Sequence, residues 1–123
     1  MRFILLTILM LGVFDIKAQD IKLIRDLYQK SPFNEIACDS LSIILKNNNK
    51  TNQINAYTGT YYMIKSKFLD NPIMKIKYFN KGKEILEESI ENEPNSIELI
   101  FLRYSIQKNI PKFLMYSSDL KYD

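Results

Sequence analysis

The groups in this sequence with the most potential for chemistry are a run of carboxylates on one stretch of chain. They are Glu84, Glu87, Glu88, Glu91 and Glu93. A pair of carboxylates can act as general acid and base, but these five lie on one predicted helix, on the side expected to face solvent. The sequence contains no histidine, which removes the commonest general base and the usual catalytic triads. We therefore predict no catalytic residue and a protein that is not an enzyme.

Neither a metal site nor a cofactor site is expected. Without histidine, and with Cys38 as the one cysteine, the usual zinc ligand sets are missing. The three glycines form no phosphate-binding loop. Cys38 has no second cysteine with which to form an internal disulfide. Because it lies on a predicted helix, we expect a buried, inert thiol.

Residues 1–18 have the layout of a secretory signal peptide. Arg2 supplies positive charge, an apolar run extends from Phe3 to Phe14, and Ala18 is a small residue at the exit. The run is shorter than the about 20 apolar residues that span a membrane. We expect cleavage after Ala18, with Gln19 as an alternative, and a periplasmic or secreted product. An uncleaved anchor or a buried N-terminal helix is the competing interpretation.

The remaining chain fits one domain with a modest core. Removing residues 1–18 lowers the formal net charge from +3 to +2. This balance is too weak and too mixed to indicate a nucleic-acid partner. We place the domain at residues 19–116, with a disordered tail at 117–123 and no stable membrane span after signal cleavage.

The spacing of apolar residues predicts an all-α domain of about five helices. A first helix begins at Asp20 and ends near Lys30. A second is expected to begin with Ser31 as its N-cap and Pro32 at its first position, with Phe33 on its buried stripe. A third has the clearest period, with a stripe formed by Ile54, Tyr57, Tyr61, Ile64 and Phe68.

Two further helices follow. The fourth starts at Asn71-Pro72 and ends before Pro94, because the residue before a proline is pushed out of helical geometry. The fifth runs from Ile97 to about Lys108. The predicted buried face of the fourth helix comprises Tyr78, Gly82, Ile85, Leu86, Ser89 and Ile90.

Small residues on the third and fourth helices indicate a close crossing. A glycine inside a helix costs about 1 kcal/mol relative to alanine, so Gly82 needs a compensating role. A side chain there would hold two helices apart. The predicted helix-packing residues are Gly59, Gly82 and Ser89.

The spacing of Gly82, Leu86, Ser89 and Pro94 resembles the second helix of a tetratricopeptide repeat, and Gly59 with Tyr62 fits the first helix of the same repeat. Gly59 and Gly82 are 23 positions apart, against about 12 in the standard repeat of about 34 residues, so the segment between them would be an insertion. The resemblance covers about residues 20–108. It implies antiparallel helical hairpins stacked in a degenerate array; a generic helical bundle is the alternative. The segments AYTGTYYMIKSK and YFNKGKEILEESIENEPNSIELIFLRYSIQKNIPKFL also resemble uncharacterised small exported proteins of Bacteroidota, a group that brings no known activity with it.

Such an array implies protein or peptide binding in the cell envelope. Tyr62 lies off the main stripe and, beside Lys65, is a candidate for an exposed groove. Lys83 and Glu87 have the spacing of an ion pair within one helix. The predicted partner-binding residues are Tyr62, Lys65, Lys83 and Glu87.

Lysines are crowded around the turn between the third and fourth helices. They include Lys67, Lys75 and Lys81, opposed only by Asp70, and the glutamates follow them directly. Two interpretations stay open: basic and acidic edges that meet between neighbouring helices or molecules, or drift on a tolerant surface.

Two other functions remain possible from the sequence. One is a carrier for a small apolar ligand or a lipid, with a cavity lined by Met63, Ile64, Met74, Phe101 and Met115. The other is a structural subunit completed by a partner, which the apolar segment IPKFLMYSSDL suggests.

Overall fold

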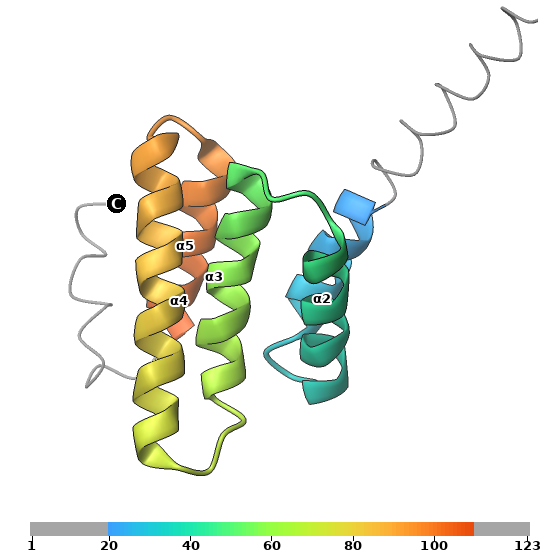
Figure 1. The fold of residues 1–123 in the computed structure, drawn as a ribbon, viewed down its shortest axis with the longest axis vertical. Coiled ribbons are helices and arrows are strands. Elements are labelled where there is room, and N and C mark those ends of the chain that lie inside the picture. Colours follow the sequence, from blue (N-terminus) through green and yellow to red (C-terminus); the bar gives the residue numbers. More distant parts are fainter. Residues whose placement is uncertain (1–19, 110–123) are drawn as a thin grey trace, which may run out of the picture.

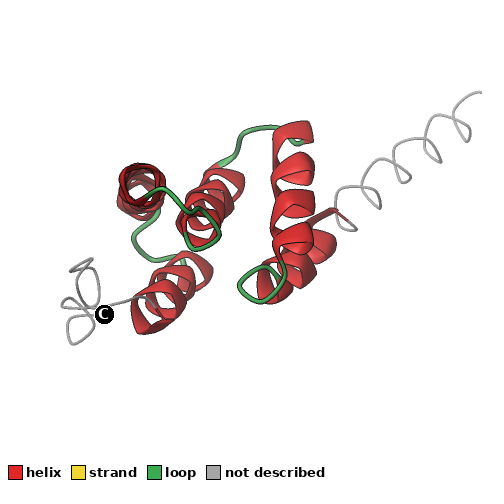
Figure 2. Cartoon of the chain, turned by 90° about the horizontal axis from the view of Figure 1, so that it is seen from below, coloured by secondary structure: helices red, strands yellow, loops and turns green. Residues whose placement is uncertain are grey.

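The computed structural model describes residues 20–109, and this part of the chain is all helical, without strands (Figure 2). A first helix at residues 20–30 is followed by α2 (Glu35–Asn47), α3 (Asn52–Ser66), α4 (Pro72–Asn92) and α5 (Ile97–Asn109) (Figure 1). The prediction of five helices is confirmed. The predicted signal peptide, residues 19 and 110–116 of the predicted domain, and the predicted tail lie outside the described residues. None of the helices within 20–109 has the length and apolarity needed to cross a bilayer.

The start of α2 differs from the prediction. Ser31 does not cap α2: it is buried, and its hydroxyl donates a hydrogen bond to the Tyr28 carbonyl oxygen at 2.7 Å, which closes the first helix. The N-cap of α2 is Asn34, whose side-chain oxygen accepts from the backbone N–H of Ile36 at 2.9 Å. Residues 31–33 form a turn. As a result, the side chain of Phe33 is 86% exposed instead of buried.

The other predicted boundaries agree closely with the structure. Asn71 caps α4 by accepting from two backbone N–H groups, and Pro72 occupies the first helical position, where its missing N–H has no partner to lose. The fourth helix ends at Asn92, before Pro94. The hydroxyl of Ser96 accepts from the Leu99 N–H at the start of α5.

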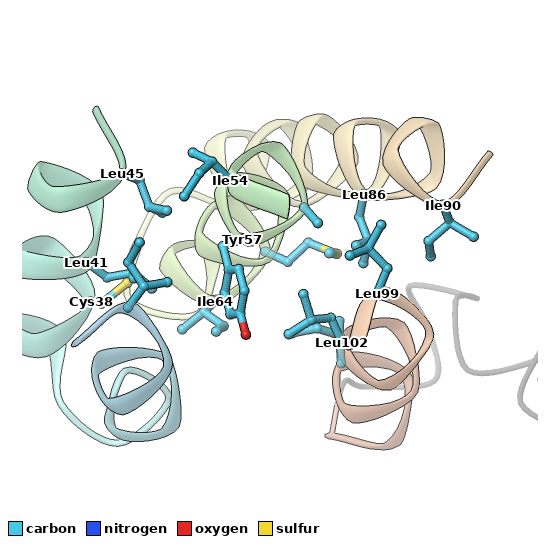
Figure 3. Close-up of a cluster of buried hydrophobic side chains, with 14 of the residues drawn as sticks. Cys38, Leu41, Leu45, Ile54, Tyr57, Ile64, Leu86, Ile90, Leu99 and Leu102 are labelled. Atoms are coloured by element: carbon cyan, nitrogen blue, oxygen red, sulfur yellow. The ribbon is translucent and has the colours of Figure 1, made fainter. Parts of the chain in front are cut away.

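Helix α3 is the central element and contacts α2, α4 and α5. From its predicted stripe, Ile54, Tyr57 and Ile64 are buried, and Tyr61 and Phe68 are half-buried against the same core. Figure 3 shows buried side chains of α2 on one side of this helix and of α4 and α5 on the other.

The crossing of α3 and α4 is formed by glycine on both helices. A Cβ atom added to Gly82 would lie 2.8 Å from the Cγ atom and 2.9 Å from the backbone nitrogen of Met63, and closer still to the Gly59 carbonyl oxygen. A Cβ atom added to Gly59 would lie 2.7 Å from the Gly82 carbonyl oxygen and 2.8 Å from the Leu86 nitrogen. Neither position accepts a side chain without movement of backbone. Gly59 lies against Leu86, whereas Met63, one turn later in α3, lies against Gly82, one turn earlier in α4. The two helices therefore run antiparallel.

The buried face of α4 matches the prediction except at its aromatic residue and at Ile85, which is half-buried. Gly82, Leu86, Ser89 and Ile90 are buried. The aromatic that joins them is Phe79, which is 2% exposed, whereas Tyr78 is only half-buried. Positions three and four residues before Gly82 both fit a helical period, and the pattern alone does not choose between them.

A cluster of polar side chains fastens the first helix to α3 and α5. We call it the Glu98 cluster: Arg25, Gln53, Tyr57 and Glu98. The Glu98 carboxylate accepts from Arg25 Nε at 2.9 Å and Nη2 at 3.1 Å, from Gln53 Nε2 at 2.8 Å and from the Tyr57 hydroxyl at 2.6 Å. The guanidinium of Arg25 is the main cause that lowers the pKa of Glu98 below its usual value. The cluster therefore joins three helices through one ionised carboxylate.

Candidate functional site

An apolar groove of about 650 Å³ lies where the ends of the first helix, α3 and α5 meet the N-terminal half of α4. Its floor consists of Met63, Ile64, Phe79 and Ile106, all between 2% and 6% exposed. These side chains reach the floor because each lies on the core-facing side of its helix. Met63, Ile64 and Ile106 lie near the C-terminal ends of α3 and α5, and Phe79 lies in the N-terminal half of α4. We call this site, with the rim described next, the apolar groove.

The rim of the apolar groove combines exposed apolar side chains with lysines. Phe33 is 86% exposed and Ile76 is 50% exposed. The Lys67 Nζ atom donates to the Pro32 carbonyl oxygen at 2.7 Å and lies 5.8 Å from the centre of the Phe33 ring. The Lys75 Nζ atom donates to the Lys67 carbonyl oxygen at 3.4 Å. No carboxylate is among the described residues that line the groove.

The hydroxyl groups that line the groove have structural partners. Ser66 donates to the Met63 carbonyl oxygen at 2.5 Å, and Ser105 donates to the Leu102 carbonyl oxygen at 2.9 Å and also contacts the Tyr28 hydroxyl. Burial raises the pKa of Tyr28. With no histidine in the chain, these serines lack the base that usually activates such a nucleophile.

Two of the predicted partner-binding residues hold helices together inside the molecule. The Lys65 ammonium group pairs with Asp39 at 2.7 Å and with Glu35 at 3.0 Å, which links α3 to α2, and its side chain is only 16% exposed. Glu87 accepts from Arg103 Nη1 at 3.0 Å, which links α4 to α5. All three ion pairs therefore link neighbouring helices.

The other two predicted partner-binding residues, Tyr62 and Lys83, lie on α3 and α4. Tyr62 lines a polar depression of about 430 Å³ between α3 and α4. Its neighbour there is Lys81, whose Nζ atom lies 4.4 Å from the centre of the Tyr62 ring, and Lys65 does not line this depression. Lys83 is half-buried on α4 and lines neither hollow. The role of these four residues in partner binding stays a prediction.

The cavity predicted for an apolar ligand is partly assembled. Met63 and Ile64 line the apolar groove, but Met74 and Phe101 are 38% and 58% exposed and do not line it. Met115 lies outside the described residues. The apolar pattern of the sequence did not single out Phe79 and Ile106 as groove residues, and no motif connected Lys67 and Lys75 with a site. The crowding of lysines around the α3–α4 turn was the available signal.

Cys38 is fully buried in the core cluster, where burial raises the pKa of its thiol to about 11 and keeps it protonated at neutral pH. Within residues 20–109, no group of three or more carboxylate or thiol side chains is placed to hold a metal ion.

The apolar groove is the surface in the described part that we consider further as a binding site. The chain matches no protein-family model, no curated protein and no solved structure.

Proposed function

We propose that this protein is a non-enzymatic, exported helical module that binds an apolar segment of a peptide or protein in the apolar groove. The observation that carries the proposal is the groove itself: four buried apolar side chains at its floor and an accessible volume of about 650 Å³, within the about 300–1,000 Å³ typical of binding pockets. The location in the cell envelope rests on the signal-peptide layout of residues 1–18.

The proposed architecture is a short tetratricopeptide-like stack. The first helix with α2, and α3 with α4, would be two successive hairpins, and α5 would open a third. The Gly59–Gly82 contact would set the close approach within the second hairpin. The Glu98 cluster joins the first helix, α3 and α5, which would be the leading helices of their units. Stacked hairpins of this kind present grooves that proteins use to bind extended segments.

A polypeptide fits the groove better than a small hydrocarbon because the mouth is open. The Phe33 and Ile76 side chains on the rim are largely exposed to solvent, so a ligand held here keeps one side in water. An amphipathic segment places apolar side chains on the floor and its polar side outward.

A substitution on the rim tests this proposal. Ile76→Asp places a charge beside the floor of the groove, on an exposed position of α4 where folding tolerates it. Ile43→Asp, on α2, is the matched control, because Ile43 is 61% exposed and does not line the groove. We expect apolar peptides from an array, measured by fluorescence anisotropy, to bind the wild type and the control equally. Binding to Ile76→Asp should be weaker by roughly tenfold or more, since an apolar side-chain contact contributes about 1.5–3 kcal/mol. Equal binding by all three proteins would contradict the proposal.

The second candidate is a carrier for a small apolar ligand, favoured by the Met63 and Ile64 side chains on the groove floor. Its test is a titration with a fluorescent long-chain fatty acid. Saturable binding of one fatty acid per chain, without binding of any apolar peptide, would favour the carrier.

A further inference from the structure

We infer that the segment bound in the apolar groove carries acidic residues beside its apolar ones, on the flank that faces the α3–α4 connection. This inference rests on the function proposed above and adds the chemistry of the partner. It follows from charge complementarity at the rim.

The ammonium groups of both rim lysines face neutral acceptors. The hydrogen bonds of Lys67 and Lys75 go to backbone carbonyl oxygens, which are neutral acceptors. Within residues 20–109, the ion pairs involve other cations, and neither of these two ammonium groups has a carboxylate partner. Lys65, two residues before Lys67, shows the contrast, because Glu35 and Asp39 neutralise it.

The two lysines also occupy one side of the groove. Lys67 lies directly after the end of α3 and Lys75 lies in the first turn of α4, and the Nζ atom of Lys75 reaches the backbone of Lys67. The Lys67 side chain also reaches the end of the first helix, where its Nζ atom meets the Pro32 carbonyl oxygen. The edge at the end of α5 contributes the uncharged amide of Asn109. A segment lying in the groove therefore meets positive charge on one flank and neutral hydrogen-bonding groups on the other.

Such an arrangement selects partners by charge. Complementary charge at the rim raises the association rate and fixes the register of the bound segment, while like charge is repelled. A peptide with Asp or Glu on the matching flank is favoured, and one with Lys or Arg there is rejected.

The experiment compares three labelled peptides that share one apolar centre and differ in their flanks, which carry Asp, Asn or Lys. Anisotropy titrations use the full chain after signal removal. We expect the Asp-flanked peptide to bind roughly tenfold more tightly than the Lys-flanked one at low salt. The difference should shrink several-fold at about 0.5 M salt because exposed charges are screened.

Charge reversal at the rim provides the decisive variant. In Lys67→Glu/Lys75→Glu, the Lys-flanked peptide should bind more tightly than the Asp-flanked one. The control Lys22→Glu/Lys46→Glu changes the net charge equally at exposed positions that do not line the groove, and it should keep the wild-type order. If the reversed protein fails to fold by circular dichroism, Lys67→Gln/Lys75→Gln replaces it and should abolish the preference.

The outcomes separate this inference from the proposed function. Equal affinity for the three peptides overturns the inference and leaves the groove as a peptide site. No binding of any peptide overturns both. Binding of dodecanoate without binding of the peptides overturns both in favour of a carrier. The control Lys22→Glu/Lys46→Glu must keep the preference for the Asp-flanked peptide. If it loses this preference as fully as the rim variant does, the inference is overturned, because the net charge of the protein would then explain the preference.

Discussion

At the scale of single residues, the distance between α3 and α4 is set by two positions without side chains. Gly59 and Gly82 face each other. A residue with a Cβ atom at either position would clash with backbone atoms of the opposite helix. Backbone cannot rotate away as the end of a flexible side chain can. The poor helix propensity of Gly82 is therefore compensated by the approach of two helices.

Gly82→Ala should lower the free energy of unfolding. Alanine gains about 1 kcal/mol in helix propensity, but its Cβ atom must displace the Gly59 carbonyl and Met63, and overpacking of this kind costs about 1–3 kcal/mol. We expect a net loss of about 1–2 kcal/mol in urea denaturation. The control is Asn80→Ala at an exposed position of the same helix, which should match or exceed the wild type. A midpoint for Gly82→Ala at or above the wild-type value would show that the crossing is not tight.

At the scale of elements, the first helix depends on the Glu98 cluster for part of its attachment. Glu98 accepts four hydrogen bonds from three side chains. Its contribution is moderated by solvent, since the side chains of Arg25 and Glu98 are 52% and 27% exposed.

Glu98→Gln should destabilise the protein in a pH-dependent manner. At neutral pH we expect a loss of about 1–2 kcal/mol, because the amide retains the shape but not the charge. The folded-state pKa of Glu98 lies below its usual value of 4.5, so its stabilisation is complete above that value and is lost as the pH falls through the folded-state pKa. Urea denaturation between about pH 6 and pH 3 should show the difference between wild type and variant shrinking toward acid. A constant difference across this range would mean that the charge of Glu98 does not contribute.

The helices themselves were largely predictable from the sequence, because apolar period, Asn71-Pro72 and Pro94 are local signals. The start of α2 was not predictable in this way, because Ser31 and Asn34 are both good N-cap residues. Only the burial of Ser31 against the first helix decides between them. Phe79 was missed for a related reason: Tyr78 fits the same period, and packing against α3 and α5 makes the choice.

At the scale of the whole molecule, the apolar groove is built from four segments that are distant in the sequence. Ile64, Phe79 and Ile106 have the spacing of ordinary core residues in their own helices. They form a groove because the surrounding helix ends leave space there. Lys67 and Lys75 come close together through the α3–α4 turn. No local pattern encodes this assembly, and the partner-binding role of Tyr62, Lys65, Lys83 and Glu87 stays a prediction.

Methyl NMR spectroscopy on the protein labelled at isoleucine and methionine methyl groups tests whether this groove is the binding surface. The titrant is the Asp-flanked apolar peptide. We expect saturable shift changes at Met63, Ile64, Ile76 and Ile106, while the exposed methyl groups of Ile36 and Ile43 on α2 stay unchanged. Saturable changes confined to α2, or a spectrum that the peptide leaves unaltered, would contradict a binding role for the apolar groove.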